Sequence, residues 1–292
     1  MRIISFSLTF ILLITNLHGY EFKWNLNTNE ILRVKSYVKQ NIFTNNTFAK
    51  YVEILNKASM EVKSVSYSSG SKFYGIEGNF YVFSKEHLKD KEFKLEEIYL
   101  SKYILQEDGN MVISREYLMP VARNIPTFVK TSINPKDEWS YKGKEIHKIG
   151  FSDVYDIVEI DFNVHYKLLG ITNIESKEIG IIEIKYAFAD VFKKTRIIDY
   201  LSGSSEMIYY WNISEGKPYY MVENYFFNAI YKNGISVIYS GSSESTLEVV
   251  KKWNEQNKKE VISKLNETLT NIKNIETSTN ETGIDISIPD IM

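Results

Sequence analysis

The chain has 292 residues, no Cys and a formal net charge of −2. Without Cys it can form neither disulfides nor thiolate metal sites, and without a basic excess it lacks the charge expected of a nucleic-acid-binding protein. Its stability must therefore come from a buried core. The content of 21 Tyr, 16 Phe and 4 Trp with only 5 Pro favours β-strands in that core.

Residues 1–19 resemble a cleavable secretory signal peptide. Arg2 supplies a positive charge, residues 3–17 are mostly apolar, and Gly19 is a small residue suited to the position before the cut. An uncleaved membrane anchor is the alternative, but it needs roughly 20 apolar residues, and this run is shorter and diluted by Ser and Thr. We therefore expect a mature N-terminus near Tyr20, export, and a location in the periplasm or on the periplasmic face of an outer membrane.

Residues 20–132 are predicted to form a first β-module. A charged stretch at 85–97 predicts a loop or one helical turn, and Glu-Asp-Gly-Asn at 107–110 predicts a hairpin turn. Alternation of apolar and polar residues predicts strands at 31–38, 51–55, 60–67, 72–83, 98–105 and 111–117.

Residues 118–137 contain three of the five prolines and are predicted to be an extended connector between two modules. Pro120 and Pro126 fix the backbone of this connector, because each proline ring restricts φ. Phe128 and Trp139 are large aromatic residues beside it, and we expect both to pack in the interior where the modules join.

Arg123 and Asn124 are expected to hold the connector in place. Arg offers five donors, which suit the carbonyls and carboxylates around a bend that lacks ladder hydrogen bonds of its own. Binding of a ligand by these two residues is the alternative interpretation.

Residues 133–242 are predicted to form a second β-module. The segments 24–30 and 139–145 resemble each other weakly, which either reflects a duplication or is a chance likeness among Tyr-rich strands. Alternation predicts strands at 158–169, 179–188, 194–200, 206–211, 219–229 and 235–239.

The pattern changes near the C-terminus. Ser-Thr-Leu-Glu at 245–248 matches a capping box, and apolar residues then recur at helical spacing, so residues 243–276 predict a long amphipathic helix. We expect its apolar stripe to pack on the second module or to pair with another copy of the chain. Residues 277–292 predict a polar linker and an incomplete, unpaired strand at 283–288.

No motif for catalysis, for a cofactor or for a metal is found. His87, His147 and His165 lack metal-ligand spacing, and acidic pairs such as 96–97 are typical of a solvated surface. The sequence therefore predicts a non-enzymatic protein that has no catalytic, cofactor-binding or metal-binding residues and that binds no nucleic acid.

The connector resembles a known family. Residues 118–128 (LMPVARNIPTF), 135–139 (PKDEW) and 143–147 (GKEIH) are similar to a run in the N-terminal region of spirochaetal OmpA-family envelope proteins of the treponemal membrane-antigen type. The resemblance implies a β-rich region, a helix and a C-terminal OmpA-type domain that is usually associated with peptidoglycan. Residues 283–292 resemble only the opening of that domain, so no peptidoglycan-binding residue is transferred and peptidoglycan binding is not expected. The chain is then either a short natural form or part of a longer protein.

The predicted fold is mainly β, with two consecutive antiparallel β-sandwich-like modules followed by the long helix. The leading hypothesis is a structural or interaction module of the cell envelope, with envelope proteins or outer-membrane components as partners. The alternatives are a periplasmic carrier of a lipid or other hydrophobic ligand, and an integral outer-membrane β-barrel. Two closed, filled sandwiches would favour the first hypothesis, an apolar cavity of several hundred Å³ the second, and an outward apolar band the third.

Overall fold

The computed structural model describes residues 19–151, 154–252, 259, 261–265, 267, 276–279 and 284–287. Residues 1–18 of the predicted signal peptide lie outside this range, so cleavage stays a prediction. Of the described helices, none is long and apolar enough to cross a membrane.

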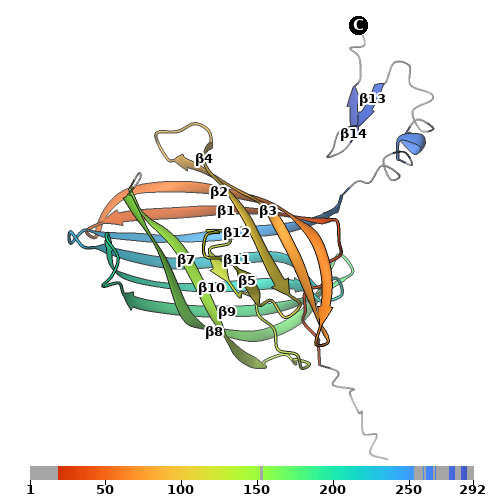
Figure 1. Ribbon diagram of the computed structural model, residues 1–292, viewed down its shortest axis with the longest axis horizontal. Coiled ribbons are helices and arrows are strands. Elements are labelled where there is room, and N and C mark those ends of the chain that lie inside the picture. The colour runs from red at the N-terminus through yellow and green to blue at the C-terminus, as the bar shows by residue number, and fades with distance from the viewer. Residues whose placement is uncertain are drawn as a thin grey trace, which may run out of the picture.

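The described chain is dominated by one antiparallel sheet of 12 strands that curls into a nearly closed barrel (Figure 1). The strands are β1 Glu30–Thr44, β2 Thr47–Ser68, β3 Ser71–Glu86, β4 Lys94–Gln106, β5 Met111–Ile113, β6 Ala122–Arg123, β7 Glu138–Phe151, β8 Val154–Ile174, β9 Lys177–Val191, β10 Ile198–Asn212, β11 Lys217–Tyr231 and β12 Ser236–Lys251.

The first and last long strands pair with each other. β1 lies between β2 and β12, with Glu30 opposite Lys251 and Thr44 opposite Val237. The sheet therefore runs without interruption from β5 through β1 and β12 to β6. The prediction of two sandwich-like modules is wrong. Alternation shows which side chains share a face of a strand, but it does not show which strands become neighbours.

The prediction of a long C-terminal helix over residues 243–276 is also wrong. Residues 245–248 lie in the middle of β12, where Ser245 is opposite both Ser36 of β1 and Met221 of β11. Two available neighbouring strands override the local capping signal. Helical positions in the described part begin only at Lys259. The strand expected without a partner also has one, because β14 (Ile284–Ser287) pairs with β13 (Glu276–Thr279).

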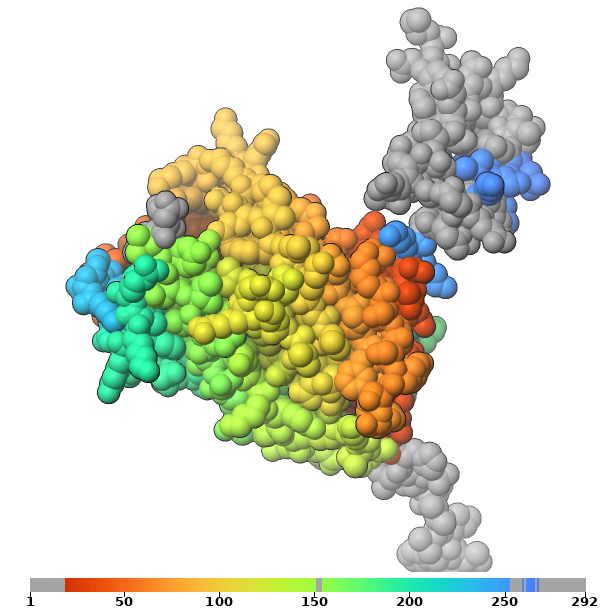
Figure 2. Space-filling view, in the orientation of Figure 1, coloured from red at the N-terminus to blue at the C-terminus, as the bar shows by residue number. Residues whose placement is uncertain are grey.

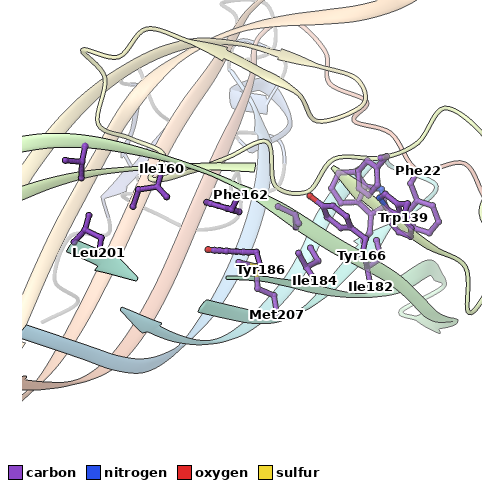
Figure 3. Close-up of a cluster of buried hydrophobic side chains, with 14 of the residues drawn as sticks. Phe22, Trp139, Ile160, Phe162, Tyr166, Ile182, Ile184, Tyr186, Leu201 and Met207 are labelled. Atoms are coloured by element: carbon purple, nitrogen blue, oxygen red, sulfur yellow. The ribbon is translucent and has the colours of Figure 1, made fainter. Parts of the chain in front are cut away.

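Apolar side chains fill much of the barrel interior. Along β8, alternate residues from Val158 to Leu168 are buried, whereas Asp161 and His165 between them are exposed. This is the reverse of a membrane-spanning barrel, whose apolar side chains face outward. Figure 3 shows the larger of two buried clusters, which draws on β7 to β11. The smaller one draws on β1 to β4.

Residues 20–29 close one end of the lumen, which we call the plugged end. Tyr20 bridges Ile133, and the Trp24 amide donates to the Glu107 carbonyl at 2.7 Å. Phe22 is buried against Gly180, where an added Cβ would lie 2.5 Å from the phenyl ring, so the close approach requires glycine. The opposite end carries the β1–β2, β3–β4, β9–β10 and β11–β12 connections, the end of β7 and the start of β8, and we call it the loop end.

The connector fills the gap between the two edges of the sheet. On one side the Ser101 hydroxyl of β4 donates to the Met119 carbonyl at 2.5 Å. On the other side the Ile146 amide of β7 donates to the Val121 carbonyl at 3.1 Å. The connector therefore completes the wall that the strands leave open.

A single, nearly closed sheet predicts that the two halves of the chain fold only together. Produced separately, residues 20–132 and 133–252 should each lack a cooperative thermal transition by circular dichroism, because each half loses the β1–β12 ladder and exposes the inner face of its strands. The chain 20–252 is the control and should unfold cooperatively. A half that melts cooperatively alone would contradict the single-sheet interpretation.

Candidate functional site

A cavity of about 440 Å³ occupies the half of the lumen nearer the loop end. Its walls come from β1, β7, β9, β10, β11 and β12 and from Val121 and Ala122 of the connector. Two carboxylates, Glu145 and Glu223, face this space among aromatic side chains. They are the groups from which we build the site.

Glu145 is a buried residue on β7 held by two neighbours. Its Oε1 accepts a hydrogen bond of 2.5 Å from the Tyr186 hydroxyl of β9, and its Oε2 lies 2.7 Å from Nε2 of His147. Burial, reinforced by the Glu145 charge, raises the pKa of Tyr186 well above its ordinary value. Tyr186 therefore stays a neutral hydroxyl that donates to Glu145.

Glu223 on β11 is bound by two serines from the flanking strands. Ser205 of β10 donates to Oε1 at 2.6 Å, and Ser243 of β12 donates to Oε2 at 3.0 Å. Burial raises the pKa of Glu223, the charge of Glu145 adds to the effect, and the two serine hydrogen bonds oppose it without cancelling it. The two carboxylates therefore interact across the lumen, and Glu223 sits where a negative charge is poorly solvated.

The remaining wall is largely aromatic. Tyr225 donates to the Gln40 Oε1 at 2.7 Å, and the Phe227 and His147 rings lie 4.6 Å apart between centroids. Burial raises the pKa of Tyr239 to about 12. The lining also includes Phe188, Phe226 and Tyr231. Such walls bind apolar or flat groups, and the carboxylates provide hydrogen-bond acceptors beside them.

Positive charge is scarce in this cavity. Lys148 is the one Lys or Arg among its described lining residues, and its ammonium lies 3.1 Å from Glu97 of β4, across the gap between the sheet edges. The carboxylates are held instead by neutral hydroxyls and by His147. The cavity therefore offers acceptors and negative charge, together with apolar surface, to anything that enters it. No set of three or more described His, Asp or Glu side chains is arranged to hold a metal ion.

A smaller cavity of about 210 Å³ lies toward the plugged end and is mostly apolar. Ala122 lines both cavities, so the connector separates them. The indole Nε1 of Trp24, which lines the smaller cavity, is buried with no hydrogen-bond partner among the described residues. Its other lining residues include Leu32, Met60, Leu105, Met111, Met221 and Leu247.

Arg123 lies within the connector and is almost fully buried. Its guanidinium donates to the carbonyls of Pro120 and Tyr117 and lies 3.7 Å from the Glu159 carboxylate. Burial lowers the pKa of Arg123, and the Glu159 charge opposes that effect. Arg123 does not line either cavity.

The other residues singled out in the connector lie close together. The Asn124 Oδ1 accepts from the Met111 amide at 2.8 Å, and its carbonyl accepts from Tyr166 at 3.3 Å. Trp139 stacks on Tyr166 and donates from Nε1 to the Thr127 carbonyl at 2.8 Å.

Phe128 is fully buried, with its ring 4.7 Å from that of Trp211 and 5.7 Å from that of Phe22. Pro120 and Pro126 both line the smaller cavity. These aromatic contacts anchor the connector to the residues that plug the lumen.

Sequence reasoning missed Glu223 and assigned no site role to Glu145 or His147. The alternation of residues along β11 did indicate Glu223, because it places Glu223 on the same face as Met221, Tyr225 and Phe227. These three residues line the cavities. A carboxylate in the inward phase of an aromatic strand is the pattern that indicates a polar group inside a barrel.

No family model matches the chain, and no curated protein sequence matches it. Among solved structures it is similar to a Bacteroides fragilis protein described as exported and as having a YmcC-like fold, at 10% identity and a TM-score of 0.31. The match covers 79% of this chain and 99% of that one. A likeness at this level carries no argument about the present chain. The resemblance to spirochaetal OmpA-family proteins stays a prediction.

Replacing Arg123 by Lys should destabilise the barrel. A single ammonium cannot reach two carbonyls and Glu159 together, so the free energy of unfolding should fall by about 2 kcal/mol or more. Chemical denaturation measures this change. Arg115→Lys is the matched control, because Arg115 is exposed although it also contacts Glu159. Equal effects of the two variants would contradict the anchoring role.

Replacing Glu223 by Gln should stabilise the protein at neutral pH. A carboxyl whose pKa is raised on folding binds its proton more tightly in the folded state, so the wild type loses stability as pH rises from the ordinary value of 4.5 to the raised value. The gain at pH 7 should be on the order of 1 kcal/mol and should vanish below about pH 4. Thermal melts across this range test it, with exposed Glu248→Gln as the control. A gain that does not depend on pH would contradict the assignment.

Proposed function

We propose that this protein is an exported binding protein that carries an amphiphilic ligand in the lumen of its barrel. The observation that carries the proposal is the cavity of about 440 Å³ between β7, β9, β11 and β12. Cavities that bind small molecules have about this volume and combine apolar walls with a few placed polar groups. A purely structural module would need no such space in its core.

The lining indicates how a ligand would be oriented. Its apolar part would lie on the aromatic wall that includes Phe188, Tyr225 and Phe227, and its polar part would reach Glu145 and Glu223. Because both carboxylates are acceptors, that polar part would donate hydrogen bonds or carry positive charge. An anionic headgroup such as a free fatty acid would be repelled by the same two side chains.

The arrangement of the outer wall supports a carrier in preference to a membrane-spanning barrel. Outward residues of β2 and β9 include Glu53, Lys57, Glu183 and Lys185, and Lys185 pairs with Glu183 at 2.9 Å. Charges at these positions would be unfavourable against lipid chains. The export that we propose places such a carrier in the cell envelope.

Ligand binding can be tested with the uncharged dye Nile red. Wild-type protein 20–252 should bind the dye saturably, and Ala229→Met should weaken the binding severalfold because it puts a longer side chain into the cavity wall. Asn224→Ala, on the exposed face of the same strand, is the control and should bind as the wild type does.

The natural ligand can be sought in parallel. Organic extraction of the protein purified from its own cell envelope, followed by mass spectrometry, should release an amphiphile that is missing from the Ala229→Met variant. Equal dye binding by wild type and Ala229→Met, together with an extract that does not differ between them, would overturn the proposal.

A further inference from the structure

We propose that the loop end of the barrel docks on the surface of an anionic lipid bilayer. The docking surface, which we call the rim patch, comprises Val154, Tyr155, Val191 and Ile235 with Lys193, Lys194 and Lys232. Its residues lie at the start of β8, at the end of β9 and in the β9–β10 and β11–β12 connections, which gather at one side of the molecule (Figures 1 and 2). The inference goes beyond ligand binding, because it concerns where the protein meets its source of ligand.

The rim patch exposes apolar side chains at strand ends. Val154 and Val191 are 56% and 54% exposed, and Tyr155 and Ile235 are also counted among the exposed large apolar residues. The β3–β4 loop at the same end adds Leu88, which is 95% exposed. Aliphatic and aromatic tips at this density are typical of surfaces that insert into the headgroup region of a membrane.

Basic side chains stand among these tips. Lys193 and Lys194 are exposed between β9 and β10, and neither forms an ion pair with a described carboxylate. The Lys232 ammonium donates to the carbonyls of Lys193 and Thr195, which adds its charge to the same loop. Arg196 lies beside Asp156, and Asp190 and Asp199 flank the loop on its strands. The apex of the loop is therefore basic although the whole chain has a net charge of −2.

The plugged end exposes fewer large apolar side chains than the loop end does. Its turns are polar, with Ser69 and Gly70 in one, Glu107 to Asn110 in another and Glu175 and Ser176 in a third. Some of its lysines are paired, as Lys177 is with Glu215 at 3.2 Å and Lys217 with Glu30 at 3.0 Å, whereas Lys72 and Lys130 donate to the neutral side chains of Asn25 and Ser71. Tyr67 and Val112 are exposed near these turns, but the loop end gathers more such side chains, and they lie next to Lys193 and Lys194.

The position of the rim patch relative to the cavity favours a lipid surface as its partner. The strands that end in the rim patch, β7, β9 and β11, also carry Glu145, Tyr186 and Glu223, so the patch lies at the end of the barrel that holds the larger cavity. An anionic bilayer matches the patch in charge and takes up its apolar tips. An acidic protein or polymer would match only the charge.

Vesicle co-sedimentation tests the inference. The chain without its predicted signal peptide, residues 20–292, should bind vesicles of phosphatidylcholine with phosphatidylglycerol. It should bind much less to phosphatidylcholine alone, with an affinity that falls as salt is added. Lys193→Glu combined with Lys194→Glu should weaken the binding about tenfold or more. Val191→Ser combined with Ile235→Ser should weaken it at all salt concentrations, because apolar insertion is not screened.

The matched control reverses the same number of charges elsewhere. Lys35→Glu combined with Lys142→Glu changes two exposed lysines on the outer wall and should leave vesicle binding unchanged. Melting temperatures of all variants should match the wild type, since every site is exposed. Absence of binding to the anionic vesicles, equal loss in the control, or equal binding to a soluble polyanion would each overturn the inference. None of these results bears on the Nile red experiment, so the two proposals fail independently.

Discussion

The pairing of β1 with β12 determines the rest of this structure. It joins the strand nearest the N-terminus to a strand more than 190 residues later, so every other strand must lie on one side or the other of this pair. A barrel of 12 strands encloses more space than inward side chains alone fill. The chain therefore fills part of that space with its own backbone, using residues 20–29 at one end and the connector in the wall. What these two segments leave unfilled becomes the cavities.

The backbone N–H and C=O groups of the connector need other hydrogen-bond partners, because the connector lacks a continuous ladder with the neighbouring strands. Side chains provide such partners. Arg123 binds the carbonyls of Pro120 and of Tyr117, which immediately precedes the connector. Asn124 holds the β5 backbone, and Tyr166 and Trp139 bind the backbone of Thr127. The connector also packs closely against the β4–β5 turn, since an added Cβ at Gly109 would lie 2.0 Å from the Pro126 carbonyl oxygen. The same groups that stabilise the connector thereby fix the boundary between the polar and the apolar cavity.

Local chemistry could be predicted from the sequence, and long-range pairing could not. Alternation located strands such as β8 and β9, and the Glu-Asp-Gly-Asn turn at 107–110 does connect β4 and β5. The β1–β12 pairing leaves no local mark, which is why the chain looked like two modules. The capping box at 245–248 failed for the same reason, because the partners that make it a strand lie far away in sequence. The inward position of Glu223 could have been predicted, because Glu223 lies on the same face of β11 as Met221 and Tyr225.

Glu223 lowers the stability of the folded protein. A carboxylate among aromatic rings, held by two serine hydroxyls and facing a second carboxylate, is less stable there than an uncharged side chain of the same size would be. Met221 before it and Tyr225 and Phe227 after it show that an apolar residue fits this phase of β11. Proteins keep destabilising residues of this kind where function requires them. The Glu223 carboxylate lowers the stability of the protein alone, but it stabilises a complex with a ligand that brings a hydrogen-bond donor or a positive charge. A binding site for a polar headgroup needs a group of this kind.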